Sequence, residues 1–224
     1  MFSKKPSLAE ARADMVNKQL IDRHITDARV LEAMREIPRH LFVDRTLWDS
    51  AYKDRPLPIG FGQTISQPYI VAFMTQALQL PVDGQGVVLE IGTGSGYQAA
   101  ILSRLAAQVY SIERVRALAD RTQLLLKRLG IENVKIKVGD GGYGWPEYAP
   151  YDAIVTTAAA PELPAPLKVQ LKDGGRLVAP VGPRGQQDLL RLQRQGDRLN
   201  QEKLAPVAFV PLIGEHGWEE DEDQ

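Results

Sequence analysis

The chain of 224 residues has no cysteine, only three histidines and no excess of either charge. The absence of cysteine excludes disulfides, thiolate metal sites and a cysteine nucleophile. No two of His24, His40 and His216 lie three to five residues apart, so the histidine spacing of a zinc site is absent too. We therefore predict no metal centre. The formal net charge of -1 gives no overall attraction to nucleic acid or to an acidic membrane, so neither partner is predicted.

Long hydrophobic runs and a secretion signal are also missing. No apolar run approaches the roughly 20 residues of a membrane-spanning helix. The basic residues 1–6 lead into no apolar segment of signal-peptide length. We therefore expect a soluble, cytoplasmic protein. Hydrophobic residues make up 44% of the chain and charged residues 25%, the mixture of an ordinary globular protein. The length suits a single domain over 1–224 with a sizeable core.

Residues 1–80 are predicted to form helices and loops, because apolar residues at helical spacing alternate there with proline and glycine. Ser7 and Glu10 have the spacing of a capping box. Pro68 suits the first turn of a helix, where its missing N–H costs nothing. The predicted helices are 7–20, 27–37 and 68–80, with an irregular segment at 39–66.

Residues 81–213 show short apolar runs that alternate with helical segments. The predicted strands are 87–91, 109–112, 134–138, 151–156, 175–181, 188–193 and 205–210, and the predicted helices are 97–105, 114–129 and 164–171. This alternation indicates a doubly wound α/β fold, with a mostly parallel, seven-stranded sheet and helices on both faces. Ligands bind to such sheets beyond the carboxyl ends of the strands. The acidic residues 219–224 are predicted to be a disordered tail.

The glycine-rich stretch 92–96 lies between a predicted strand and a predicted helix, where a nucleotide-binding loop would lie. Its spacing differs from the dinucleotide fingerprint, because Tyr97 occupies the last glycine position, and no Gly-Lys-Ser/Thr of a P-loop follows. A pyrophosphate ligand is therefore disfavoured. A glycine-rich turn without any ligand is an equally good interpretation of the loop by itself.

Acidic residues follow the next two predicted strands. Glu113 lies 21 positions after Gly92, about the distance at which an acid accepts hydrogen bonds from ribose hydroxyls. Asp140, with Gly141 beside it, is suited to contact an adenine edge. The ordinary alternatives are an exposed acid at a helix start for Glu113 and a turn for Asp140. Three such features at successive strand ends favour a nucleoside ligand without a phosphate site, and S-adenosylmethionine fits this description.

Two stretches resemble known families. Val88-Leu89-Glu90-Ile91-Gly92-Thr93-Gly94-Ser95-Gly96-Tyr97 resembles the first motif of class I methyltransferases. Gly62-Gln63-Thr64-Ile65-Ser66-Gln67-Pro68, preceded by Leu57-Pro58-Ile59-Gly60, resembles the protein-L-isoaspartate O-methyltransferase family. Further stretches that resemble this family are 38–43, 152–159 and 171–178. The resemblance runs from about residue 14 to about residue 213.

The resemblance implies a Rossmann-like methyltransferase fold, a monomer, and S-adenosylmethionine as the cofactor. It implies that the free α-carboxylate of isoaspartyl residues in proteins and peptides is methylated. The ester then collapses to a succinimide, whose hydrolysis gives some normal aspartate. The implied residues are Ser66 for catalysis; Gly92, Thr93, Gly94, Ser95, Gly96, Glu113, Arg114, Asp140 and Gly141 for the cofactor; Gln63, Thr64, Ile65 and Pro68 for the substrate; and 211–216 as a segment that closes over the substrate.

The stretch 60–68 contains neither an acid nor a base. An α-carboxylate has a pKa of about 3.3–3.7, so it is already a nucleophile at neutral pH and needs no general base. Ser66 has a second interpretation as a helix cap, because it lies just before Pro68. A class I methyltransferase for another carboxylate or small molecule, and a binding module with a degenerate methyltransferase fold, remain the alternative functions. A serine hydrolase is disfavoured because Ser66 has no G-x-S-x-G motif around it.

Overall fold

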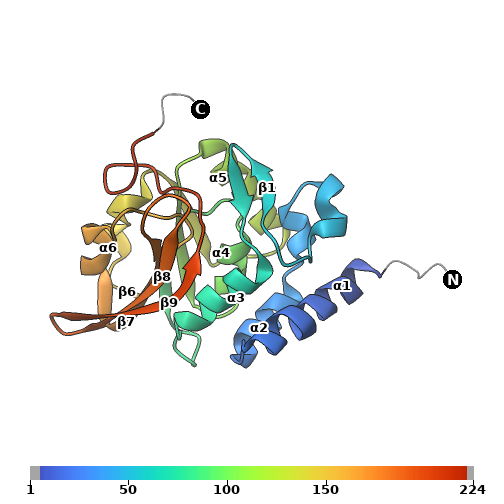
Figure 1. The fold of residues 1–224 in the computed structure, drawn as a ribbon, viewed down its shortest axis with the longest axis horizontal. Helices are drawn as coiled ribbons and strands as arrows, with labels where there is room; N and C mark the ends of the chain where they lie inside the picture. The colour runs from blue at the N-terminus through green and yellow to red at the C-terminus, as the bar shows by residue number, and fades with distance from the viewer. Residues whose placement is uncertain (1–5, 221–224) are drawn as a thin grey trace.

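The computed structural model describes residues 6–220, and its main element is a seven-stranded sheet in the order β5-β4-β3-β6-β7-β8-β9 (Figure 1). The strands are β3 (Val87–Ile91), β4 (Gln108–Glu113), β5 (Val134–Val138), β6 (Tyr151–Thr156), β7 (Leu171–Val181), β8 (Gln187–Gln195) and β9 (Arg198–Val207). Strands β3 to β7 pair in parallel, and β8 and β9 are added antiparallel. The predicted mostly parallel, seven-stranded sheet is confirmed.

Helices cover both faces of this sheet, which explains why its central strands are apolar throughout. Val88 packs in a core with the N-terminal helices, whereas its neighbours Leu89 and Ile91 pack in a second core on the opposite face. Buried parallel strands have this nearly continuous apolar sequence. The α-helices are α1 (Leu8–Met15), α2 (Ala28–Glu36), α3 (Pro68–Ala77), α4 (Tyr97–Leu102), α5 (Arg116–Arg128) and α6 (Ala165–Val169).

The order of the strands reverses between β3 and β6. From β3 the chain adds β4 and then β5 on one side, and β6 is the first strand on the other side. A crevice forms beyond the carboxyl ends of strands at such a switch point, and it is the usual ligand site of doubly wound sheets. The glycine-rich stretch 92–96 follows β3 directly, so the fold places it at this crevice.

A two-stranded hairpin lies within the segment 39–66, which was predicted to be irregular. Strands β1 (Leu57–Gly60) and β2 (Gln63–Ile65) pair antiparallel, separately from the main sheet. The prediction was wrong because Pro58, Gly60 and Gly62 indicate a loop. Here Gly60 and Gly62 instead adopt the positive φ angles that a tight turn requires. The rest of the segment contains short 3₁₀ helices at Arg39–Phe42 and Arg45–Ser50.

Other predicted boundaries were also wrong. Strand β7 begins at Leu171 rather than at residue 175, and the helix predicted at 164–171 is only Ala165–Val169. Strand β9 begins at Arg198 rather than at residue 205, because its first half is polar and exposed at the sheet edge and carries no apolar alternation. The first helix is not α-helical to Leu20, since it changes to a π-helical turn at Val16–Leu20 and a 3₁₀ turn at Ile21–Arg23. The predicted capping box of Ser7 and Glu10 is present.

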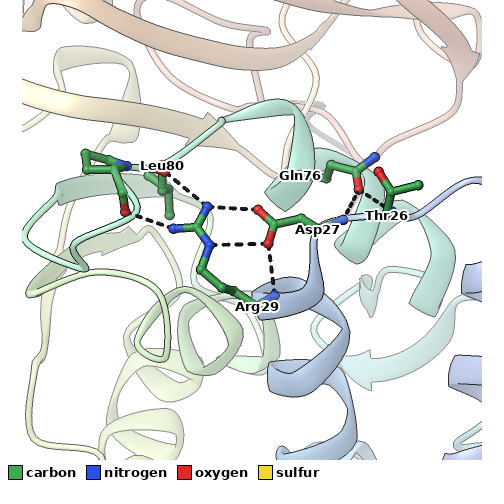
Figure 2. A network of polar contacts seen from close by, with 6 residues as sticks. Thr26, Asp27, Arg29, Gln76 and Leu80 are labelled. Atoms are coloured by element: carbon green, nitrogen blue, oxygen red, sulfur yellow. Dashed lines mark hydrogen bonds and ion pairs between the residues drawn. The ribbon is translucent and has the colours of Figure 1, made fainter.

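Polar contacts join α2 to the end of α3 (Figure 2). The carboxylate of Asp27 caps α2 and pairs with Arg29, whose guanidinium also donates to the carbonyl oxygens of Leu80 and Pro81. Gln76 Oε1 of α3 accepts the backbone N–H groups of residues 26 and 27. The N-terminal helices are thereby fixed to the helix that follows Ser66.

Near the carboxyl terminus, Glu220 pairs with Arg114, and the carbonyl oxygen of Glu219 accepts a hydrogen bond from Arg184. The remainder of the predicted acidic tail, 221–224, lies outside the described residues. Among residues 6–220, no helix combines the length and the apolar character needed to cross a membrane.

Candidate functional site

A cleft that is partly open to solvent lies at the carboxyl ends of β3 and β4. One wall comes from β2 and the residue after it, and the opposite wall from residues 210–213. Most of the predicted site residues line this cleft. They are Gln63, Thr64, Ile65, Ser66, Gly92, Thr93, Gly94, Ser95, Glu113, Arg114 and Gly141. The structure therefore brings together residues that are up to 78 positions apart in the sequence.

Hydrogen bonds from neighbouring segments to the backbone of Gly92 hold the glycine loop at 92–96. Gly92 N–H donates to Ile112 O of β4 at 2.8 Å, and Gly92 O accepts from the Thr157 hydroxyl at 2.6 Å. Gly92 has a φ of +94°, and a Cβ atom there would lie 2.4 Å from Thr157 Oγ1. The loop therefore requires glycine at this position for two reasons, its backbone conformation and its close approach to Thr157.

Glu113 is buried at the end of β4 and closes the loop from the other side. Its Oε2 accepts the N–H of Gly94 at 2.7 Å, and its Oε1 accepts the N–H of Val115 at 2.8 Å. Each carboxylate oxygen has a second lone pair, so the group retains the capacity to accept two further hydrogen bonds from a ligand that enters the cleft.

A buried hydroxyl chain lies beneath the loop. Glu90 of β3 is fully buried and accepts a short hydrogen bond from Ser111 Oγ of β4, and Ser111 Oγ lies 2.6 Å from Thr93 Oγ1 in the loop. Burial raises the pKa of Glu90 to about 8, and the nearby charge of Glu113 acts in the same direction. Glu90 is therefore largely a neutral acid at neutral pH.

Four of the predicted site residues have other contacts. Gly96 and Pro68 begin α4 and α3 and do not line the cleft. Asp140 does not line it either, because its two oxygens accept the backbone N–H groups of Gly142 and Glu215. Arg114 lines the cleft, but its guanidinium pairs with Glu220 at 2.7 Å.

Of the predicted closing segment 211–216, residues 211–213 line the cleft, and the backbone of the following turn is fixed to Asp140 through Glu215. Trp218 donates its backbone N–H to Leu212 O and so closes this turn.

Ser66 is half-buried at the junction of the cleft with a second, more open groove. Thr64, Ser66, Thr157 and Val210 line both spaces. The helix-cap interpretation of Ser66 is wrong, since the N-cap residue of α3 is Gln67 and the N–H of Tyr69 is accepted by Asp54. Within residues 6–220 the Ser66 hydroxyl has no hydrogen-bond partner, so it is available to a molecule in the cleft.

The cleft is suited to orienting a ligand rather than to moving protons. Its ionisable lining groups are Glu113, Arg114 and Tyr97, and burial raises the pKa of the Tyr97 phenol further above neutrality. The groups at the Ser66 end are an amide and two hydroxyls, from Gln63, Thr64 and Ser66 itself. These groups orient a ligand by hydrogen bonds and do not act as a general base near neutral pH.

Comparison with known proteins identifies the chain. A family model described as protein-L-isoaspartate(D-aspartate) O-methyltransferase matches residues 10–217. The chain belongs to this family. The Protein-L-isoaspartate O-methyltransferase of Methanoculleus marisnigri is 58% identical over 208 residues, which cover 93% of this chain and 94% of the relative.

Solved structures agree with the family assignment. One named protein-L-isoaspartate O-methyltransferase superposes with a TM-score of 0.81 at 31% identity, and the match covers 92% of this chain and 67% of that chain. A second, a protein-L-isoaspartate O-methyltransferase from Plasmodium falciparum in complex with S-adenosyl-L-homocysteine, superposes with a TM-score of 0.78 at 25% identity over 90% of this chain and 98% of that chain. The Rossmann-like methyltransferase fold is thereby confirmed.

Several residues around the site of this isoaspartate methyltransferase family member were not singled out from the sequence. Glu90 carried a usable signal, because an acid inside a buried apolar strand requires an explanation. Thr157, which follows β6 as the glycine loop follows β3, carried a weaker one. Asp54 carried none, since it lies in a polar loop and its partners are distant in the sequence.

Proposed function

We propose that the chain transfers a methyl group from S-adenosylmethionine to the free α-carboxylate of L-isoaspartyl residues in proteins and peptides, as its family does. The observation that carries this assignment to the site is the position of Ser66. Its unpartnered hydroxyl lies where the cleft with the glycine loop meets an open groove. A cofactor in the cleft and a polypeptide in the groove would therefore meet at Ser66.

The residues of the cleft fit the cofactor. Gly92 and Gly94 line the cleft with backbone alone, and the buried carboxylate of Glu113 retains lone pairs for two ribose hydroxyls. The complex of the Plasmodium falciparum relative with S-adenosyl-L-homocysteine supports the same cofactor here. S-adenosylmethionine supplies an electrophilic methyl group on a sulfonium. We assign Gly92, Thr93, Gly94, Ser95, Glu113 and Gly141 to holding it.

The remaining assigned residues act on the cofactor site indirectly. Gly96 shapes the start of α4, where a Cβ atom would lie 2.4 Å from Thr122 Cγ2. Asp140 fixes the turn after residue 213 to Gly142. Arg114 holds the carboxyl-terminal segment through Glu220. Their contribution is to fix the walls of the cleft.

The acceptor requires orientation and exclusion of water, and no proton transfer. An α-carboxylate is ionised near neutral pH, so the lack of a base beside Ser66 is consistent with the chemistry. Ser66, with Thr64 and Gln63, would donate hydrogen bonds that hold one carboxylate oxygen and direct the other toward the methyl group. Orientation of this kind accounts for a large part of the rate of a bimolecular reaction. Ile65 and Pro68 fix the backbone on either side of Ser66, since both are buried.

Two synthetic peptides that differ in one isoaspartyl or aspartyl linkage test this function. With labelled S-adenosylmethionine, we expect base-labile label on the isoaspartyl peptide alone. Equal labelling of both peptides would contradict recognition of the isoaspartyl linkage. Binding of S-adenosylmethionine without any labelling would favour a methyltransferase for a different carboxylate or small molecule. A monomeric state and a cytoplasmic location stay predictions, which sedimentation and fractionation test.

A further inference from the structure

Asp54, in the loop before β1, joins three segments next to Ser66. Its Oδ1 accepts the backbone N–H of Tyr69 at 3.1 Å. Its Oδ2 accepts from Arg23 Nη1 at 2.5 Å and from the side-chain amide of Gln67 at 3.4 Å. Arg23 ends the 3₁₀ turn Ile21–Arg23, which lies between α1 and α2, and Gln67 directly follows Ser66. The carboxylate of Asp54 thus accepts hydrogen bonds from Gln67 and Tyr69, the residues on either side of Pro68.

Asp54 replaces a local cap at the start of α3. The first N–H groups of a helix have no partner within it, and a side chain of the N-cap residue normally accepts one of them. Here the N-cap residue is Gln67, which makes no such bond, and Pro68 has no N–H. The cap therefore comes from a residue 13 positions before Gln67. The direction in which the chain leaves Ser66 depends on this long-range contact.

Arg23 balances the charge that this arrangement brings close to the acceptor site. Its guanidinium lies 3.4 Å from the centre of the Tyr69 ring while it pairs with Asp54, and it lines the open groove. The other charged residue that lines this groove is Asp188, which pairs with Lys203. Since the acceptor is an anion, an unbalanced carboxylate at Asp54 would repel it, and the ion pair removes this repulsion.

We infer that Asp54 is a positioning residue for Ser66, and that Arg23 neutralises Asp54 so that an anionic acceptor can approach. This inference rests on the proposed function, because it needs a carboxylate acceptor at Ser66. Neither residue touches the cofactor cleft. The expected effects are therefore confined to the acceptor, and cofactor affinity is the internal control.

The chain offers a matched control at the amino ends of the parallel strands. Asp152, at the amino end of β6, accepts the backbone N–H of Val87 at 2.9 Å and pairs with Lys172 at 2.7 Å. This carboxylate joins a backbone N–H to a partly exposed cation, as Asp54 does, but it lies away from Ser66. If destabilisation alone lowered activity, substitution of Asp152 would lower it as much as substitution of Asp54.

The test compares Asp54→Ala, Asp54→Asn and Arg23→Ala with Asp152→Ala and Lys172→Ala. It measures kcat and KM for an isoaspartyl peptide, S-adenosylhomocysteine affinity by calorimetry, and thermal unfolding. For Asp54→Ala we expect kcat/KM to fall by roughly 10- to 100-fold, the size of effect that a displaced catalytic group produces, with cofactor affinity within about twofold. Asp54→Asn keeps an oxygen that can accept the Tyr69 N–H, so its kcat/KM should be close to that of the wild type. Asp152→Ala should lower stability alone.

Arg23→Ala tests the charge. It leaves the cap intact and exposes the carboxylate, so KM for the peptide should rise by roughly 3- to 10-fold, and less at high salt. Adding Asp54→Asn to Arg23→Ala should restore KM. The inference is overturned if wild type is active and either Asp54→Ala lowers kcat/KM no more than Asp152→Ala does, or Asp54→Asn fails to relieve Arg23→Ala. A wild type that does not methylate the isoaspartyl peptide would instead overturn the proposed function.

Discussion

The glycine loop and the segment that carries Ser66 line the same cleft but are held in different ways. The loop connects the buried strand β3 to α4, and backbone and side-chain hydrogen bonds of the core hold it through Ile112, Glu113 and Thr157. The Ser66 segment follows a hairpin that lies outside the main sheet. Its nearest polar support is Asp54, a partly exposed carboxylate in another loop.

This difference divides the cleft into two halves, one for the cofactor and one for the acceptor. The half that holds the cofactor is part of the fold, so changes there should affect stability and cofactor binding together. The half that holds the acceptor is attached to the fold by side chains, so changes there should affect the acceptor and leave stability nearly unchanged.

The largest effect is expected from Gly92→Ala. The positive φ of Gly92 costs a residue with a Cβ atom about 1–2 kcal/mol, and displacement of Thr157 raises the total to about 2–4 kcal/mol. Because the loop must shift, S-adenosylhomocysteine affinity should fall by about 100-fold or more. Calorimetry and urea denaturation measure the two effects. Gly130→Ala is the control, since that glycine has a φ of +68° but open space around it, and it should lose only about 1 kcal/mol. If both variants lost the same unfolding free energy, the contact with Thr157 would not be the cause of the loss.

The next largest effect is expected from Glu113→Ala. Hydrogen bonds to a charged group contribute about 1.5–3 kcal/mol, so cofactor affinity should fall by about 10- to 100-fold. The variant also frees the N–H groups of Gly94 and Val115, so its unfolding temperature should drop as well. Glu113→Gln keeps one acceptor oxygen, so its cofactor affinity should lie between those of the wild type and Glu113→Ala. Unchanged affinity for S-adenosylmethionine in calorimetry would exclude Glu113 from the cofactor site.

The sequence indicated that most of the glycine-loop half lies at one site because its determinants are local. The strand, the glycines and the acid at the next strand end lie within 27 consecutive residues, 87–113, and parallel α/β geometry brings the strand ends together. The polar residues of the Ser66 segment were also found, but through the family resemblance and not through a physical pattern.

The supports of the Ser66 segment were not predictable in the same way. Asp54 contacts residues 31 positions before it and 15 positions after it, and no periodicity signals such contacts. The β1–β2 hairpin was missed because its prolines and glycines are typical of a loop. The edge strand β9 was placed too late because exposed polar residues form its first half, and edge strands need no apolar alternation when neighbouring backbone pairs with them.

We expect the stability of the protein to depend on pH through Glu90, which lies beneath the glycine loop. The folded-state pKa of Glu90 is raised by burial from 4.5 to about 8, so between these values the folded protein keeps a proton that the unfolded chain releases. Unfolding free energy should therefore fall as pH rises, by up to about 1.4 kcal/mol per pH unit from this group. Glu90→Gln cannot ionise and should lose this slope. Urea denaturation across this pH range measures both proteins, and parallel pH profiles would show that Glu90 is not the cause.

The smallest effect is expected from Ser66→Ala, although Ser66 lies at the centre of the proposed chemistry. A hydrogen bond to a carboxylate contributes about 1.5–3 kcal/mol, but Thr64 and Gln63 would still hold the acceptor, so turnover in a single-turnover assay should fall by only about tenfold. Cofactor affinity and unfolding temperature should stay the same, because Ser66 caps no helix and has no hydrogen-bond partner among residues 6–220. Unchanged turnover would move the acceptor contact to Thr64 or Gln63. A loss of stability would contradict the distinction between the two halves of the cleft, because it would mean that the Ser66 segment is held by Ser66 itself. The expected order, with Asp54→Ala more damaging than Ser66→Ala, follows from the structure: Asp54 places the whole segment, whereas Ser66 supplies one of its donors.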